Sequence, residues 1–175
     1  MNAIATVYGG RLYRSRLEAR HAAFFDLLGW KYEYEPFDLR GYIPDFILFG
    51  HDPRGILVEV KPVLKFPQFA ADKIRESGWD GEALILGCVV PLPAAVNREA
   101  FGWMQESRGY WSEACLGRWR AGNGKIGFCH ADGGFVDRIS GGHDGGSFGS
   151  RGVSPREISD LWARSGNSVQ WRAPR

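Results

Sequence analysis

The stretch from residue 42 to residue 61, YIPDFILFGHDPRGILVEVK, decides the fold that we expect for this chain. Residues 42–49 are mostly apolar and predict a strand, with Pro44 near its start, where a missing backbone donor is tolerated. Residues 50–55 are rich in turn formers, and residues 56–61 alternate between apolar and polar side chains. The stretch therefore predicts two antiparallel strands joined by a short loop.

Two carboxylates and one ammonium group lie on this predicted strand pair. Glu59 and Lys61 are two residues apart, so their side chains leave the same face of one strand. Pairing with the other strand can bring Asp45 to the same edge. Clustered carboxylates repel one another unless a hard divalent cation lies between them, and a lysine beside such a cation can orient or deprotonate a water. The alternative is that Glu59 and Lys61 are the exposed face of an edge strand.

Further helices and strands are predicted on both sides of this pair. Ser15 and Glu18 have the spacing of a capping box, ahead of a helix that we expect to end at Gly29. The other predictions are a strand at 30–36, a helix at 67–76 with Phe69 and Ile74 on its apolar side, a buried strand at 83–90, a short helix at 97–105, hairpins within 111–139 that turn at 122–124 and 132–134, a flexible glycine-rich loop at 141–152, and a capped last helix that starts at Ser154. This order predicts an α/β fold, with a core in residues 1–95 and an extension in residues 96–175 that packs on it.

Composition excludes several classes of protein. The chain has 175 residues, 44% of them hydrophobic and 24% charged, which excludes wholesale disorder. Its apolar runs are far shorter than the roughly 18 residues of a membrane span, so we expect no membrane partner. Residues 1–16 lack the pattern of a secretory signal, and three widely spaced cysteines suit a reducing compartment. We therefore expect a cytoplasmic protein.

Basic side chains gather near both ends of the chain, although the net charge is only +2. Arg11, Arg14, Arg16 and Arg20 crowd the start of the chain, and five arginines follow residue 150. These groups could contact a phosphate backbone. The alternative is that they are solvated faces of terminal helices.

The ordered set of residues resembles a known superfamily. Pro44-Asp45, thirteen intervening residues and then Glu59-Val60-Lys61 are similar to the motif of the PD-(D/E)xK phosphodiesterases, the restriction-endonuclease-like nucleases. Residues 13–20, 34–36 and 42–46 further resemble a small branch of that superfamily encoded by phages and bacteria. The resemblance covers residues 13 to 90, about half of the chain.

The resemblance implies a mixed central β-sheet flanked by helices, with a hairpin and a helix as the C-terminal extension. It also implies a nuclease that hydrolyses DNA phosphodiester bonds with Mg²⁺ or Mn²⁺ and leaves 5′-phosphate and 3′-hydroxyl ends. Asp45 and Glu59 would be metal ligands together with the carbonyl of Val60, and Lys61 would be the catalytic lysine. Glu18 would complete the acidic cluster or reach a second metal, unless it only closes the capping box.

Several other predictions accompany this interpretation. We expect the DNA contacts to come from Arg14, Arg16, Arg20 and Lys73, and a homodimer or a larger nucleoprotein complex is compatible with the small size of the chain. His21 is best explained as a core histidine, and Glu35 either supports the site or lies on the surface. The alternative function is a DNA-binding or assembly subunit of a larger complex, such as transposase, phage or defence machinery, which is inactive alone.

Overall fold

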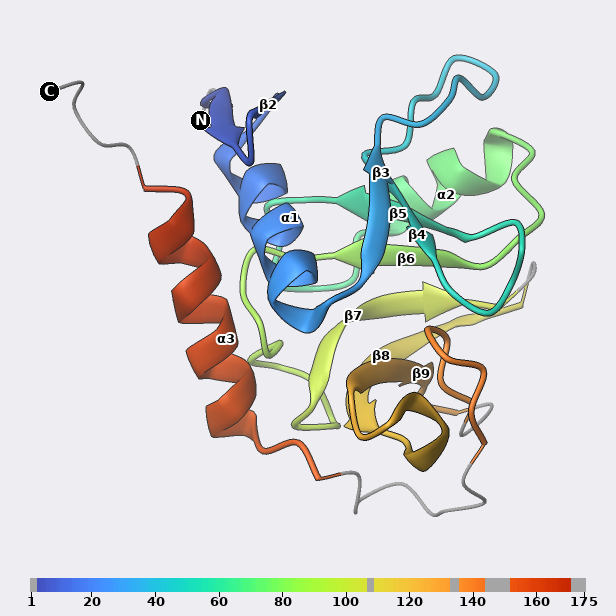
Figure 1. Cartoon of the computed structure of the whole chain (residues 1–175). Coiled ribbons are helices and arrows are strands. Elements are labelled where there is room, and N and C mark those ends of the chain that lie inside the picture. Colours follow the sequence, from blue (N-terminus) through green and yellow to red (C-terminus); the bar gives the residue numbers. More distant parts are fainter. Residues whose placement is uncertain (1–2, 107–108, 133–135, 144–151, 171–175) are drawn as a thin grey trace, which may run out of the picture.

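A seven-stranded mixed sheet forms the centre of the protein in a computed structural model that describes residues 3–106, 109–132, 136–143 and 152–170 (Figure 1). The strands follow one another in chain order across the sheet: β3 (Lys31–Tyr34), β4 (Phe46–Phe49), β5 (Ile56–Val60), β6 (Ala83–Leu86), β7 (Ala100–Gln105), β8 (Trp111–Arg118) and β9 (Ile126–His130). Neighbouring strands are antiparallel except β5 and β6. A parallel pair needs a crossover connection, and α2 (Gln68–Glu76) lies in it.

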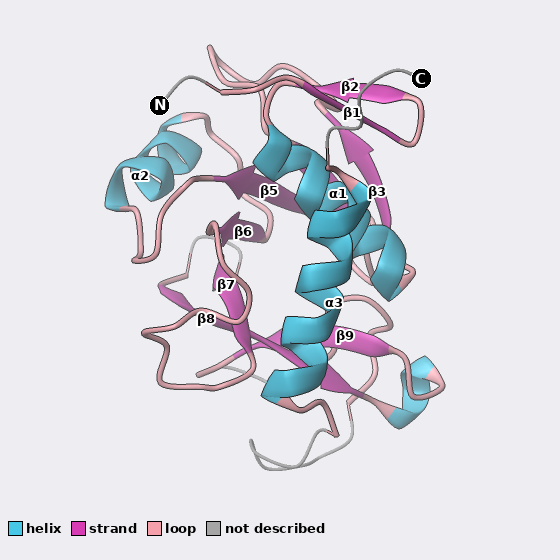
Figure 2. Cartoon of the chain, turned by 90° about the vertical axis from the view of Figure 1, so that its left-hand side faces the viewer, coloured by secondary structure: helices cyan, strands magenta, loops and turns pink. Residues whose placement is uncertain are grey.

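The helices cover both faces of the sheet. α1 (Arg16–Leu28) and α3 (Pro155–Ser168) pack against each other on one face, and α2 lies on the other (Figure 2). The alternation of β5 follows from this arrangement, because Ile56 and Val58 join the core under α1 while Leu57 joins the core under α2. A strand covered in this way is buried at every position. None of the helices within the described residues is long and apolar enough to cross a membrane.

Helix ends agree with the sequence prediction. Ser15 Oγ accepts a hydrogen bond from Glu18 N at 3.1 Å, and Gly29 ends α1 in the left-handed conformation with φ 71°. Ser154 caps α3 in the same way, by accepting from Glu157 N at 3.1 Å. The capping residues therefore set where these two helices begin.

A small hairpin precedes α1, and the sequence analysis did not predict it. β1 (Thr6–Tyr8) pairs with β2 (Arg11–Tyr13) through a turn at Gly9 and Gly10, whose φ angles are 56° and 78°. Two glycines with positive φ between alternating side chains are a recognised hairpin signal, so this element could have been found. The hairpin brings Tyr13 and Arg14 next to the start of α1.

The helix predicted at residues 97–105 is wrong, because Ala100–Gln105 is β7. This segment is hydrogen-bonded to β6 on one side and to β8 on the other. A Cβ added at Gly102 would lie 2.6 Å from the carbonyl oxygen of Ile85, so the close approach of the backbones requires glycine there. Strand pairing overrode the local preference that favoured a helix.

Smaller differences concern the apolar side of α2 and the lengths of the strands. Phe69 is 60% exposed, and the buried side of α2 consists of Ala70, Ala71 and Ile74. The strand expected to begin at Tyr42 begins at Phe46, because Tyr42 instead pairs with Leu39 in a tight bridge. β6 likewise ends at Leu86 instead of residue 90.

Residues after position 95 contribute β7, β8 and β9 to the same sheet and α3 to the face of α1. The turn predicted at 122–124 joins β8 to β9, with Asn123 and Gly124 at positive φ. Most of the turn predicted at 132–134 and of the loop predicted at 141–152 lies outside the described residues.

Candidate active site

The β4–β5 pair brings the two predicted carboxylates together. Phe46 pairs with Val58, and continuing this antiparallel register by one residue places Asp45 opposite Glu59. Val60 N donates a hydrogen bond of 2.7 Å to Asp45 Oδ2. Both carboxylates are buried. The predicted meeting of Asp45 with the Glu59 strand is therefore found in the structure.

The ammonium group of Lys61 lies among three oxygen atoms of this site. It donates a short hydrogen bond to Glu59 Oε1, lies 3.1 Å from the carbonyl oxygen of Val60, and lies 4.0 Å from Asp45 Oδ2. Lys61 is only partly exposed, and its neighbours on β5 are buried. The three groups expected to hold a metal, Asp45, Glu59 and the Val60 carbonyl, thus all lie near the ammonium group of Lys61.

Arg14 supplies a second cation from the N-terminal hairpin. Its Nη2 lies 2.9 Å from Asp45 Oδ1, and its Nε lies 2.7 Å from Glu35 Oε1. Glu35 has a φ of 48°, which is uncommon for a residue other than glycine, and its backbone N donates to the Asp45 carbonyl oxygen at 3.0 Å. The Arg14 side chain is 53% exposed, so it can leave Asp45 without unfolding anything around it.

Two tyrosines complete the site, and the sequence analysis gave neither of them a role. Tyr42 donates from its hydroxyl to Glu59 Oε2 at 2.6 Å. Lys73 Nζ, on α2, lies 4.7 Å from the centroid of the Tyr42 ring. Tyr34 donates to Glu18 Oε2 at 2.6 Å and accepts from Arg14 N at 2.9 Å. Spacing alone does not reveal these contacts, because each joins residues at least 16 positions apart.

Glu18 is buried and connects to the site through the Tyr34 hydroxyl. Ser15 Oγ donates to Glu18 Oε1 at 2.7 Å, so both carboxylate oxygens accept a hydroxyl proton. The backbone N of Glu18 donates to the capping side chain of Ser15, while its carboxylate accepts from both Ser15 and Tyr34. Its negative charge also contributes to raising the pKa of Asp45. Glu18 therefore adds charge to the site besides belonging to the helix cap.

The electrostatics of the site disfavour two ionised acids. Burial raises the pKa of Asp45 to about 7, and the neighbouring Glu59 adds to this shift. Lys61 and the Val60 N–H act in the opposite direction but do not cancel it. Burial and Glu59 also raise the pKa of Tyr42, which stays a hydrogen-bond donor at neutral pH. A bound cation would relieve the cost of ionising Asp45.

The donors at this site suit a hard divalent cation. Asp45, Glu59 and the Val60 carbonyl offer only oxygen atoms, and the Lys61 ammonium already stands where their oxygens converge. Within the described residues, no group of three or more Asp, Glu, His or Cys side chains could hold a metal ion. Mg²⁺ commonly binds through one or two carboxylates and completes its shell with water and phosphate oxygens, and a site of two carboxylates fits that mode.

The other predicted residues lie in different surroundings. Arg20 donates to the Trp162 carbonyl oxygen at 2.7 Å and lies 3.7 Å over the Trp162 ring, so it joins α1 to α3. Arg16 is exposed at the start of α1. His21 is fully buried and hydrogen-bonded to the Gly87 carbonyl oxygen at 2.9 Å, which confirms the core interpretation. Lys73, as described above, lies next to Tyr42.

Comparison of the chain with known proteins adds no relative to this description. No family model, curated protein or solved structure matches it. The interpretation of the site consequently depends on its own geometry, in which Asp45, Glu59 and the Val60 carbonyl surround the ammonium group of Lys61.

Proposed function

We propose that this protein is a metal-dependent nuclease with a restriction-endonuclease-like core, which hydrolyses phosphodiester bonds of DNA. The observation that carries the proposal is the convergence of Asp45, Glu59 and the Val60 carbonyl on the Lys61 ammonium. Two buried carboxylates held this close cost free energy that a purely structural strand pair would not need. A lysine at the same point can stabilise the negative charge that develops on a phosphate.

In this proposal Asp45, Glu59 and the Val60 carbonyl would hold Mg²⁺ or Mn²⁺, which supplies positive charge to a phosphate oxygen and to the leaving oxygen. Lys61 then releases Glu59, orients the attacking water and stabilises the developing negative charge. Tyr42 keeps Glu59 in place by donating to its Oε2. Hydrolysis would leave a 5′-phosphate and a 3′-hydroxyl.

Basic side chains at the edge of the site support DNA as the substrate. Arg14 is half exposed and can turn from Asp45 toward a phosphate group. Lys73 lies over the Tyr42 ring, and Arg16 is exposed beside Ser15. We leave Arg20 out of the proposed DNA contact, because its guanidinium is bound to Trp162.

A cleavage assay tests the function directly. The purified full chain is incubated with linear, circular, single-stranded and branched DNA in Mg²⁺, Mn²⁺ or EDTA. We expect cleavage with a divalent cation and none in EDTA. Lys61→Met should abolish cleavage but retain Mn²⁺ binding, because the lysine acts on the water and is not a ligand.

Lys65→Met is the matched control, since Lys65 is an exposed lysine only four positions away. It should cleave like the wild type. Undiminished cleavage in EDTA would contradict the metal requirement. A protein that binds DNA and cleaves none of these substrates would instead support the alternative function, a DNA-binding or assembly subunit of a larger complex.

A further inference from the structure

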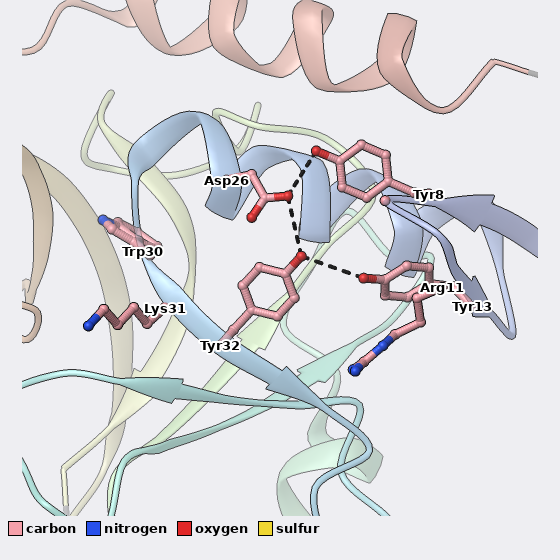
Figure 3. A pocket seen from close by; sticks show the side chains of 8 residues that line it. Tyr8, Arg11, Tyr13, Asp26, Trp30, Lys31 and Tyr32 are labelled. Carbon is pink, nitrogen blue, oxygen red and sulfur yellow. Dashed lines mark hydrogen bonds between the residues drawn. The ribbon is translucent and has the colours of Figure 1, made fainter.

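A second site lies beside the proposed active site, in a pocket of about 400 Å³ (Figure 3). The β1–β2 hairpin, the end of α1 and the beginning of β3 form its walls. Tyr8, Tyr13 and Tyr32 line it together with Asp26, which is exposed. Pockets of this volume accommodate small molecules. The pocket is distinct from the Asp45–Glu59 site, because it shares no lining residue with it.

The pocket presents the carboxylate of Asp26 as a hydrogen-bond acceptor. Asp26 Oδ2 accepts from the Tyr8 hydroxyl at 2.9 Å and from the Tyr32 hydroxyl at 3.4 Å, and the Tyr13 hydroxyl lies 3.5 Å from that of Tyr32 (Figure 3). Burial and Asp26 raise the pKa of Tyr8 to about 12, so its proton stays on the bond to Asp26. What remains for a ligand is chiefly Asp26 Oδ1, for which the described residues provide no hydrogen-bond donor. A ligand that fits must therefore bring N–H or O–H groups.

The rim of the pocket is basic. Arg11 and Lys31 are exposed on its two sides (Figure 3). Neither of them forms an ion pair within the part of the chain that the structure describes. Two cations without carboxylate partners favour an anionic ligand, and phosphate is the anion that such side chains bind in nucleic acids.

The pocket is adjacent to the proposed active site. Tyr13 lines the pocket, and the next residue, Arg14, contacts Asp45. The ring centroids of Tyr13 and Tyr34 are 4.6 Å apart, and Tyr34 donates to Glu18. Arg11 and Arg14 are both exposed and lie three residues apart, so a strand whose phosphate lies at Arg14 can continue to Arg11.

We propose that this pocket binds one unpaired nucleotide of the DNA strand that enters the active site. The base lies against the partly exposed rings of Tyr8 and Tyr32 and donates an amino group to Asp26, while neighbouring phosphates lie on Arg11 and Lys31. This inference rests on the proposed function. In a duplex the amino groups are paired and the bases are stacked, so the pocket selects single-stranded ends, overhangs or flaps.

The same chemistry predicts a preference among bases. Cytosine, adenine and guanine carry an exocyclic amino group that a carboxylate can accept from. Thymine presents one N–H between two carbonyl oxygens, and these carbonyls repel Asp26. We therefore expect cytosine-rich strands to bind more tightly than thymine-rich strands.

The test measures binding without cleavage. Fluorescence anisotropy measures the binding of short labelled oligo(dC), oligo(dT) and a duplex to the protein in EDTA. We expect oligo(dC) to bind about tenfold more tightly than oligo(dT) or the duplex. Asp26→Asn should remove the preference for oligo(dC), since the amide offers donors as well as an acceptor. Asp38→Asn, at an exposed aspartate outside the pocket, should keep it.

A rim variant keeps the test independent of folding. Lys31 is exposed, so Lys31→Gln should leave the fold intact. The variant should bind every oligonucleotide more weakly, and the number of ions released on binding should fall by about one. Equal binding of oligo(dC), oligo(dT) and duplex, unchanged in Lys31→Gln, would overturn the proposal even if the protein cleaves DNA. Base preference with no cleavage in any metal would instead leave the pocket assigned and remove the nuclease function.

Discussion

Arg14, which follows β2, and Asp45, which precedes β4, form an ion pair with 2.9 Å between Nη2 and Oδ1. The same guanidinium binds Glu35, and the remaining oxygen of Asp45 accepts from Val60 N. Every oxygen of Asp45 is thus occupied by a group of the chain. A metal ion that uses Asp45 Oδ1 competes with Arg14 for this carboxylate, and an arginine that moves away can face the substrate.

The first prediction follows from this competition. Arg14→Gln should bind Mn²⁺ about fivefold more tightly, because a positive charge that competes for Asp45 is removed. Its DNA cleavage should nevertheless fall, since the phosphate loses a cation. Isothermal titration with Mn²⁺ and a cleavage assay measure the two effects, with Arg98→Gln, at an exposed arginine, as the control. Unchanged metal affinity would contradict the competition.

The second prediction concerns Glu18. Glu18→Gln keeps one oxygen acceptor for the two hydroxyls of Ser15 and Tyr34, so unfolding by urea should show a loss of about 1 kcal/mol. If its charge supports the site, cleavage should fall at least about tenfold. Glu33→Gln, at an exposed position on β3, is the matched control. Full activity of Glu18→Gln would restrict Glu18 to the helix cap and to the positioning of Tyr34.

The third prediction uses the raised pKa of Asp45, which is about 7 in the native protein. The unfolded chain binds this proton with a pKa of about 3.9, so the native state holds it more tightly. The metal-free protein therefore loses stability through Asp45 as the pH rises from about 4 to about 7, and the loss is constant above that range.

Asp45→Asn should remove this loss. In EDTA near pH 8 the variant should be more stable than the wild type by on the order of 1–3 kcal/mol, and the difference should shrink toward pH 4. Urea unfolding at several pH values measures it, with Asp38→Asn as the exposed control. A variant that is less stable at every pH would show that the ion pair with Arg14 outweighs the cost of burying the charge.

The fourth prediction concerns the buried histidine. Burial lowers the pKa of His21 to about 4, and the neutral ring hydrogen-bonds to the Gly87 carbonyl oxygen. The unfolded chain protonates near pH 6.5, so stability falls by up to about 3 kcal/mol between pH 6.5 and 4. His21 and Asp45 thus act in opposite directions over this range.

His21→Gln keeps a donor for Gly87 and does not titrate. It should be less stable than the wild type near pH 7, because the ring contact with Trp162 is lost. Its free energy of unfolding should fall less steeply than that of the wild type between pH 6.5 and pH 4. Urea unfolding across this pH range checks both effects, and His143→Gln provides an exposed control. If the free energy of unfolding fell equally steeply with falling pH in His21→Gln and in the wild type, His21 would not be the cause of the pH dependence.

The failed prediction at residues 97–105 shows where sequence reasoning loses information. Phe101 and Met104 have a spacing compatible with a helix, but both are buried under α1 as parts of β7. Periodicity over so few residues does not distinguish the two structures. Pairing with β6 and β8 decides it, because those hydrogen bonds come from distant parts of the chain.

The sequence by itself determined the ends of α1, the pairing of β4 with β5 and the first members of the site. Ser15 and Gly29 mark the ends of α1, and the antiparallel register of β4 and β5 follows from a short loop between two apolar runs. Because that register is local, the meeting of Asp45 with the Glu59 strand could be predicted from the chain alone.

Only the tertiary structure decided what surrounds these carboxylates. Arg14 reaches Asp45 across 31 positions, Tyr42 reaches Glu59 across 17, and Tyr8 reaches Asp26 across 18. Each contact depends on how the hairpin, the loop before β4 and α1 pack around the sheet. Periodicity in the sequence indicates only whether a position is apolar and buried or polar and exposed. It does not indicate which donor meets which acceptor, because that depends on how distant segments pack in the folded protein.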